Sequence, residues 1–448
     1  MMENNNIFLW LRQMPEWARR RGFWLVDGLT GGKIKNHLEE IGRLIDEADS
    51  QWAVRQKEEL LAALLRHAIF TTSYYSGKSL SALLSDFPVV NKTIIREAGE
   101  SFCSNKVGLS ERISVFTSGS TGTPFQVYHD YEKKKRNYAD TIYFARLAGY
   151  DIGQKLLYMK IWVKEKMEHP LIYFMQNIIP VDVIKLNEDQ MESIVNKMHG
   201  DGSRYGILGY ASALELFARY LDEKHENIQS RNVGSVIAIS EALNDYTKTS
   251  LQRQFGVPVL SRYSNLENGI IAQQEPNGLS RFLVNTASYV VETLKLDSDD
   301  SAHAGELGRI VVTDLFNYAM PMIRYDTGDV GSLITDPAHP GKLFLATVEG
   351  RKLDLLYDSK GNLVSSFIVY KNMWKYPEII QYQLIQEGEK QYRFKVNARS
   401  PFAREKELVD DFKSYLGADA EIKVEYVSEV PLLASGKRKK IVNNYIKA

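Results

Sequence analysis

The most informative stretch of the chain is Phe116-Thr117-Ser118-Gly119-Ser120-Thr121-Gly122-Thr123-Pro124. It follows directly on the apolar Ile113–Val115, which indicates a strand that runs into a loop of hydroxyl and small residues. Glycine lets backbone N–H groups approach an oxyanion closely, and hydroxyls add donors, so such a loop can wrap phosphate oxygens. The order GxxxxGK[ST] of a Walker loop is absent, and a flexible surface turn is the alternative for this string alone.

Outward from this loop, short apolar runs alternate with helical patterns. Strands are predicted near Lys155–Ile161, Val233–Ile239, Gly256–Leu260 and Gly308–Thr313. Between them, Ser212-Ala213-Leu214-Glu215 has the spacing of a capping box, with the serine as the N-cap of a helix. This alternation predicts α/β layers.

The two ends of the chain differ from its middle. Leu60, Leu61, Leu64, Leu65 and Ala68 recur at helical spacing, and we expect residues 1–110 to be mainly helical. After Gly350 we expect a compact α+β unit, with elements near Ile380–Gln386, Tyr392–Val396, Arg404–Leu416 and Glu421–Tyr426. The prediction is therefore a large N-terminal domain, 1–350, and a small C-terminal domain, 355–448.

Composition excludes several classes of protein. Among 448 residues, 56 Lys and Arg balance 56 Asp and Glu, so no global field favours nucleic acid or an anionic membrane. Cys103 is the only cysteine, which excludes an internal disulfide or a thiolate cluster and fits a reducing, cytoplasmic location. The eight histidines are scattered, so a metal would be bound through oxygen. We expect no secretory signal and no membrane span, because the apolar stretch from Leu171 is broken by Gln176.

The loop at 117–124 resembles the phosphate loop of the adenylate-forming superfamily, which includes acyl-CoA synthetases. Further segments resemble the motifs of that family in the family's order. They are Ser240-Glu241-Ala242-Leu243, Tyr263-Ser264-Asn265-Leu266-Glu267, Arg324-Tyr325-Asp326-Thr327-Gly328-Asp329, Gly350-Arg351-Lys352-Leu353-Asp354 and Pro431-Leu432-Leu433-Ala434-Ser435-Gly436-Lys437. Each alone also fits a buried tyrosine, a surface ion pair, a turn or a solvated basic tail.

The resemblance implies a role for each segment. Residues 117–123 would wrap the ATP phosphates, and Ser240, Glu241 and Ala242 would lie beside the adenine. The ring of Tyr263, followed by Ser264, would pack on the adenine. Asp329 would bind the ribose hydroxyls, because a carboxylate accepts two hydrogen bonds at once.

The same resemblance implies the catalytic groups. Glu267 and Thr121 would hold Mg²⁺, Arg351 would reach the nucleotide, and Lys437 would enter the site during adenylation. The implied fold is a large multi-layer α/β N-terminal domain with a small mobile α+β C-terminal domain. Residues 351–354 would be the hinge between them.

The branch can be narrowed to phenylacetate–CoA ligases and CapK-like proteins. The segments that resemble this branch are Leu60–Tyr75, Phe87–Lys92, Gly209–Ser212 and Pro377–Ile379. Three positions depart from the superfamily pattern: Phe125 stands where many relatives carry lysine, Leu353 where the hinge is usually polar, and Ser264 where glycine is usual.

Three functions follow as hypotheses. The first is a ligase that uses ATP and Mg²⁺ to make an acyl-adenylate and transfers the acyl group to coenzyme A. The second transfers it to an amine or hydroxyl, as in capsule or surface polysaccharide synthesis. The third is a nucleotide-binding regulator without catalysis, against which the retention of Lys437 argues. The sequence does not specify the acid or the oligomeric state.

Overall fold

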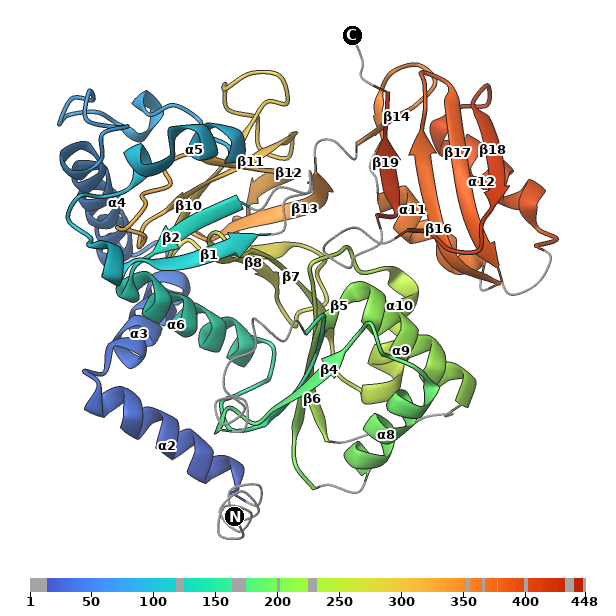
Figure 1. Ribbon diagram of the computed structural model, residues 1–448, viewed down its shortest axis with the longest axis horizontal. Coiled ribbons are helices and arrows are strands. Elements are labelled where there is room, and N and C mark those ends of the chain that lie inside the picture. Colours follow the sequence, from blue (N-terminus) through green and yellow to red (C-terminus); the bar gives the residue numbers. More distant parts are fainter. Residues whose placement is uncertain are drawn as a thin grey trace.

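The computed structural model describes residues 14–117, 125–162, 175–199, 202–224, 232–351, 355–364, 367–376, 378–398, 402–431 and 439–445. Within these residues the chain forms one large sheet, three smaller sheets and helices that cover them. Figure 1 shows the last part of the chain as a separate sheet-and-helix unit beside the rest.

The first part of the chain is helical. Its elements are α2 (Glu16–Leu29), α3 (Lys33–Asp46), α4 (Gln51–Thr71), η1 (Leu84–Asp86), α5 (Lys92–Ala98), η2 (Gly99–Phe102) and η3 (Leu109–Glu111). Helix α4 begins after Ser50, whose hydroxyl accepts a hydrogen bond from the Ala53 backbone N–H. The predicted apolar face is present, because Leu64, Leu65 and Ala68 are buried.

An eleven-stranded sheet forms the centre, in the order β10-β11-β12-β13-β9-β8-β7-β6-β5-β3-β4. In this order, the parallel part runs from the edge strand β4 to β7 and the antiparallel part from β7 to β10. The strands are β3 (Lys155–Lys160), β4 (Ile178–Asp182), β5 (Tyr205–Tyr210), β6 (Val233–Ile239), β7 (Val259–Asn265), β8 (Gly269–Gln274), β9 (Phe282–Val284), β10 (Tyr289–Leu294), β11 (Leu307–Asp314), β12 (Tyr325–Thr335) and β13 (Leu343–Arg351).

Three helices cover the parallel strands on one face (Figure 1). They are α8 (Glu188–His199), α9 (Ala211–Lys224) and α10 (Asp245–Phe255), and α6 (Tyr131–Leu147) packs against α3 and β8. β6 is buried along its whole length, as expected of a parallel strand covered on both faces. Leu214 and Phe217 of α9 contribute to the core beneath these helices.

A two-stranded hairpin carries the ends of the hydroxyl-rich loop. It is formed by β1 (Ile113–Thr117) and β2 (Phe125–His129), in which Thr117 pairs with Phe125. Residues 118–124 lie outside the described residues.

The C-terminal unit has a four-stranded sheet in the order β18-β17-β16-β19. Its elements, with a preceding two-stranded sheet, are β14 (Leu356–Tyr357), β15 (Leu363–Val364), α11 (Phe367–Asn372), η6 (Met373–Lys375), β16 (Ile379–Gln386), β17 (Gln391–Ala398), α12 (Glu405–Leu416), β18 (Glu421–Tyr426) and β19 (Ile441–Asn443). Leu408, Phe412 and Leu416 of α12 are buried against the sheet. The predicted α/β fold with a smaller α+β unit is confirmed.

Two local predictions are wrong. The strand expected over Gly256–Leu260 begins only at Val259, because Gly256 is the left-handed C-cap of α10. The capping box at Ser212 is absent: α9 already begins at Ala211, and the Ser212 N–H donates to the Glu241 carboxylate at 2.9 Å. Glu215 has other partners, which are described below.

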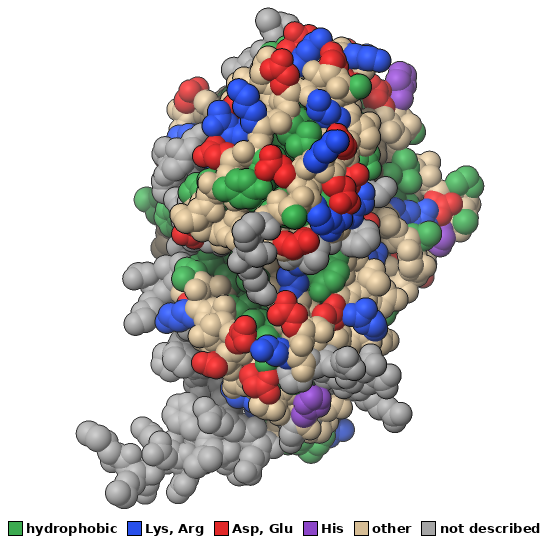
Figure 2. Space-filling model, turned by 90° about the vertical axis from the view of Figure 1, so that its right-hand side faces the viewer, with side chains coloured by type: hydrophobic (Ala, Val, Ile, Leu, Met, Phe, Trp, Pro, Cys, Tyr) green, Lys and Arg blue, Asp and Glu red, His purple; other side chains and the backbone are tan. Residues whose placement is uncertain are grey.

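Two surface properties bear on function. In the described part of the chain no helix is long and apolar enough to cross a bilayer. On the face shown in Figure 2, acidic and basic side chains are interspersed over the C-terminal unit and the helices below it.

Candidate active site

The carboxyl ends of β5, β6 and β7 bring several predicted residues to one end of the sheet. Tyr210 of β5 pairs with Ile239 of β6, and Ala238 of β6 pairs with Ser261 of β7. In a parallel sheet, the residues that follow such neighbouring strand ends lie side by side. Ser240 therefore lies beside the end of β7 that carries Tyr263.

The segment predicted beside adenine has a constrained backbone. Ser240 has φ of 71°, a left-handed conformation that is uncommon outside glycine and that clusters at functional sites. Ser240 is exposed, whereas Glu241 and Ala242 are half-buried. The hydrogen bond from the Ser212 N–H to Glu241 holds this segment against the start of α9.

Tyr263 and Asp329 are joined directly. The Tyr263 hydroxyl is 2.9 Å from Asp329 Oδ2, to which it donates, and 3.2 Å from the Thr327 hydroxyl oxygen. The Thr327 hydroxyl also accepts from the Asp329 backbone N–H and donates to the Ile310 carbonyl. Burial raises the pKa of Tyr263 well above its ordinary value, and the Asp329 charge adds to this, so the phenol stays a neutral donor. Tyr263, which is predicted to contact the adenine, thus orients Asp329, which is predicted to bind the ribose.

Glu267 lies in the turn after β7 and is almost fully buried. Its Oε1 is 2.5 Å from the Lys92 ammonium and accepts from the Tyr325 hydroxyl at 3.1 Å. Its carbonyl oxygen is 2.7 Å from His129 Nε2. A buried carboxylate needs such partners, because burial without them is costly.

Lys92 is a site residue that motif comparison does not identify. The segment before it runs beside β12, where the Val90 N–H donates to the Arg324 carbonyl and the Val90 carbonyl accepts from Asp326. This pairing brings the start of α5 to Glu267. The Lys92 ammonium also lies 5.5 Å from the centre of the Phe125 ring, at the position where many relatives carry lysine. The sequence contained two signals that bear on it: the segment Phe87–Lys92, which resembles the branch and ends at this lysine, and the departure at Phe125.

The base of the predicted phosphate loop adjoins this cluster. The Phe125 ring is stacked on Tyr325, with 6.5 Å between the ring centres. Its strand partner Thr117 is buried, and the Thr117 hydroxyl makes no hydrogen bond within the described residues. A buried hydroxyl without a partner in the protein is a candidate ligand contact. Ser118, Gly119, Ser120, Thr121, Gly122 and Thr123 lie outside the described residues.

The structure describes only some of the remaining predicted site residues. Arg351 ends β13 and pairs with Asp329 of β12, so its backbone lies beside the residue predicted to bind the ribose. The side chain of Arg351 is not among those that the structure describes. Ser264 follows Tyr263 on β7 and is half-buried. The hinge residues 352–354 and Lys437 also lie outside the described residues.

The residues fit a magnesium ion that is bound partly by the protein and partly by the phosphates of a substrate. No cluster of three His, Cys, Asp or Glu side chains able to hold a metal occurs among the described residues. Mg²⁺ is commonly bound by one or two carboxylates together with substrate phosphates. Glu267 supplies one buried carboxylate beside the base of the phosphate-type loop, which matches that pattern.

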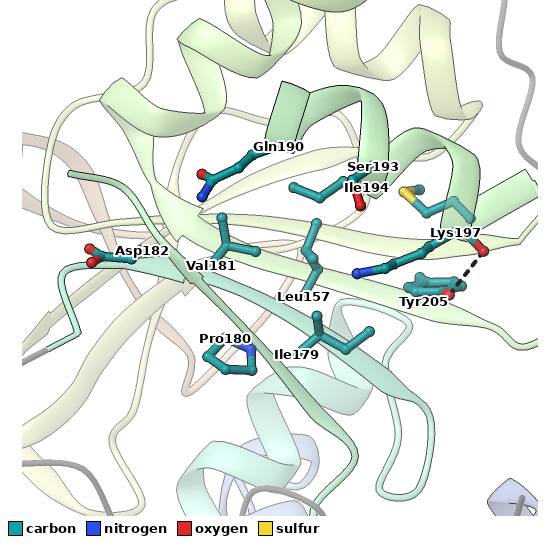
Figure 3. Close-up of a pocket in the computed structure, with 11 residues that line it drawn as sticks. Leu157, Ile179, Pro180, Val181, Asp182, Gln190, Ser193, Ile194, Lys197 and Tyr205 are labelled. Atoms are coloured by element: carbon teal, nitrogen blue, oxygen red, sulfur yellow. Dashed lines mark hydrogen bonds between the residues drawn. The ribbon is translucent and has the colours of Figure 1, made fainter. Parts of the chain in front are cut away.

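A small cavity elsewhere does not coincide with these residues. It measures about 190 Å³ and lies between the edge strands β3 and β4 and helix α8. Figure 3 shows Leu157 and Val181 of the sheet facing Ile194 and Ser193 of the helix. None of the predicted nucleotide residues lines it, so it is separate from the predicted nucleotide site.

Comparison with known proteins gives relatives of similar sequence and fold. Residues 356–444 match the family model of the CapK C-terminal domain. Protein CapK from Staphylococcus aureus is 22% identical over 442 residues, covering 92% of this chain and 93% of CapK. A crystal structure of 2-hydroxyisobutyryl-CoA ligase in the postadenylation state, bound to 2-HIB-AMP, covers 88% of this chain and 90% of its own, with 15% identity and a TM-score of 0.69.

The chain resembles the CapK-like branch of the adenylate-forming enzymes. Its fold is also similar to that of the amide bond synthetase McbA from Marinactinospora thermotolerans, with 15% identity, 74% and 68% coverage and a TM-score of 0.54. The solved structures with a similar fold therefore include one enzyme named as a CoA ligase and one named as an amide bond synthetase.

A second crystal structure of the same ligase also matches this CapK-like chain. In its thioesterification state, 2-hydroxyisobutyryl-CoA ligase gives a TM-score of 0.56 at 16% identity, again with 88% and 90% coverage. This score is lower than the 0.69 against the postadenylation state.

Proposed function

We propose that the protein is an ATP-dependent ligase that activates a carboxylic acid as an acyl-adenylate and releases pyrophosphate. The observation that carries the proposal is the convergence of Tyr263, Asp329 and Glu267 at one end of the sheet, beside the base of the loop at 118–124. These groups suit adenosine, ribose and phosphate chemistry, respectively.

The reaction brings two anions together. A carboxylate oxygen of the acid attacks the α-phosphorus, and the bond from that phosphorus to the pyrophosphate oxygen breaks. Two like unit charges at 4 Å repel by about 4 kcal/mol at an effective dielectric of 20. The site must therefore supply cations, but no general base, because a carboxylic acid is already ionised near neutral pH.

The nucleotide would be held by residues of the large unit. Ser240, Glu241, Ala242 and Tyr263 would contact the adenine, with Ser264 adjoining, while Asp329 and Arg351 would hold the ribose side. Residues 117–123 would orient the β- and γ-phosphates with backbone and hydroxyl donors. Fixing the adenosine and the leaving group in this way favours in-line attack.

Glu267, with Thr121, would hold Mg²⁺. The ion supplies charge neutralisation on the phosphate oxygens. Lys92 at 2.5 Å keeps the Glu267 carboxylate paired and in place for that role.

The second cation would come from the C-terminal unit. We propose that Lys437 bridges the attacking carboxylate and the α-phosphate. Residues 355–448 would form a domain that rotates about a hinge at 351–354 after adenylation. A ligase of similar fold has been solved in a postadenylation state and in a thioesterification state, which supports the proposal of such a rotation.

Coenzyme A is the first candidate acceptor, and an amine or hydroxyl is the second. The specific observation that favours the second is Phe125, which replaces the lysine of many relatives at the base of the phosphate loop. The resemblance to CapK-like proteins implies an acceptor in capsule or surface polysaccharide synthesis. The need for ATP and the lone Cys103 fit a cytoplasmic location.

A pyrophosphate-exchange assay across a panel of acids tests the proposal. We expect at least one acid to support exchange that depends on ATP and Mg²⁺. Adding coenzyme A, amines or sugar alcohols to that acid, with mass detection of products, identifies the acceptor. If ATP binds but no acid supports exchange, the non-catalytic regulator replaces this proposal.

A further inference from the structure

Helix α9 makes a polar contact with the C-terminal unit. Glu215 Oε2 lies 3.2 Å from the ammonium of Lys440. The two side chains are 14% and 16% exposed, so solvent screens this ion pair little. Figure 1 shows α9 and α10 on the side of the large unit that faces β16 and β19.

Glu215 is also tied to the predicted nucleotide site. The same Oε2 accepts from the Asn244 side-chain amide at 2.9 Å, and Asn244 is the N-cap of α10. Asn244 comes four residues after Ser240, and Arg219 donates to the other oxygen of Glu215 at 3.1 Å. Glu215 thus connects the adenine-side segment with the C-terminal unit.

Lys440 anchors this contact in the C-terminal sheet. Its backbone carbonyl accepts from the Leu384 N–H of β16, so its main chain is part of that sheet. Its ammonium lies 5.0 Å from the centre of the Tyr382 ring, which further limits where the side chain points. The ion pair therefore joins the C-terminal unit to α9 of the large unit.

The charge state of Glu215 suits a contact that forms and breaks. Burial alone would raise its pKa, but the charges of Lys440 and Arg219 outweigh burial and hold the pKa below its ordinary value. The group is therefore a carboxylate at neutral pH. If the C-terminal unit moved away, Arg219 and Asn244 would remain as partners, so the carboxylate would not be stranded.

We propose that Glu215 is a positioning residue for adenylation, which binds Lys440 and thereby docks the C-terminal unit against α9, beside the adenine-side segment. This inference rests on the proposed function. It assigns to Glu215 a role in one half-reaction only, because the proposed rotation about residues 351–354 would open the contact before the acyl group is transferred.

The test compares the two half-reactions in the full-length chain. Glu215→Gln is expected to lower the rate of pyrophosphate exchange at least 10-fold while changing the KM for ATP less than 3-fold. Transfer from chemically supplied acyl-adenylate to the acceptor is expected to stay at the wild-type rate or above it. The double charge swap Glu215→Lys with Lys440→Glu is expected to regain a large part of the lost exchange.

A matched control separates positioning from a general loss of an ion pair. Lys375 binds Asp411 within the C-terminal unit at 2.8 Å, so Lys375→Met is expected to alter neither half-reaction. If Glu215→Gln lowers both half-reactions in parallel, its role is structural and the proposal is overturned. Unchanged exchange in both Glu215→Gln and Lys440→Met overturns it as well.

Limited proteolysis tests the docking contact without measuring catalysis, so it separates this inference from the proposed function. Trypsin cleavage after residues 437–440 is expected to be at least 5-fold faster in Glu215→Gln than in wild type, with Lys375→Met unchanged. If no acid supports exchange but Glu215→Gln accelerates this cleavage, docking stands and the adenylation proposal falls. Equal cleavage rates in wild type and Glu215→Gln refute docking whatever the activity.

Discussion

The nucleotide end of the large sheet and the contact between α9 and the C-terminal unit are built differently. In the first, Tyr263, Glu267 and Asp329 are held by hydrogen bonds to neighbours on the same sheet. In the second, Glu215 divides its partners between its own unit and Lys440 of the other. Fixed dipoles and charges need no reorganisation when charge develops, whereas a lysine that enters and leaves needs contacts that can open.

The comparison separates a fixed part of the site, whose groups all belong to the large unit, from a delivered part, which the C-terminal unit would bring to the site. Glu267 keeps Lys92 and Tyr325 in either domain arrangement, because all three belong to the large unit. Glu215 can form its ion pair with Lys440 only while the two units are docked. Substitutions in the first group should therefore affect binding and every later step, and those in the second should affect adenylation alone.

The largest expected effect tests the delivered part. Lys437→Ala should lower pyrophosphate exchange by about 10²–10³-fold, the usual effect of losing one charge-stabilising group in a transition state. ATP binding, measured by calorimetry, should be largely kept, because Tyr263 and Asp329 remain joined. Lys423→Ala, on the exposed part of β18, is the control. Equal exchange in Lys437→Ala and wild type would remove the assignment.

A comparable substitution in the fixed part should act more broadly. Glu267→Gln is expected to lower exchange about 10²-fold and to raise the Mg²⁺ concentration needed for half-maximal rate. Chelation of Mg²⁺ should abolish exchange in wild type. The control is Glu306→Gln, in an exposed turn. An unchanged Mg²⁺ requirement in Glu267→Gln would mean that another group holds the ion.

The pairing of Lys92 with Glu267 should appear in stability. Lys92→Met leaves a buried carboxylate short of a partner and should lower the free energy of unfolding by about 1–3 kcal/mol. Chemical denaturation measures this value. The double variant Lys92→Met with Glu267→Gln should recover part of the loss, because the unpaired charge is gone. Additive effects of the two substitutions would contradict a direct pairing.

A smaller effect is expected for the bond that orients Asp329. Tyr263→Phe removes the hydroxyl that donates at 2.9 Å, and one hydrogen bond contributes about 0.5–1.5 kcal/mol. ATP binding should weaken by about 2- to 13-fold, with the maximal exchange rate nearly unchanged. A larger fall in maximal rate than in affinity would place the phenol in the chemical step.

The smallest expected effect concerns pH. Because Glu215 has its pKa held below the ordinary value, its contribution to docking is present above that ordinary value, about 4.3, and is lost as pH falls below it. Between pH 6 and 8 the contact should not titrate. Profiles of exchange rate for wild type and Glu215→Gln should thus be parallel over this window. A break in wild type that the variant lacks would contradict this charge state.

Much of the candidate site could be predicted because its motifs are local. The order of the segments and the strand before the hydroxyl-rich loop follow from short-range patterns. The alternation of apolar runs and helical faces indicated the α/β layers. Lys92 could not be found in this way, because only its position beside β12 brings it to Glu267.

Glu215 shows where local reasoning stops. Its spacing from Ser212 is that of a capping box, yet the Ser212 N–H binds Glu241 and the carboxylate of Glu215 binds Asn244 and Lys440. A sequence pattern records the spacing of two residues on one helix. It carries no information about a competing donor that arrives from 225 residues away.

The sequence by itself determined the α/β class and many of the strands and helices, and it predicted a phosphate loop, because these depend on periodicity and on backbone freedom over a few residues. Only the tertiary structure decided which charges pair. Ion pairs between distant segments depend on strand register and on the docking of whole units, and burial then fixes the partners because an unpaired buried charge is costly.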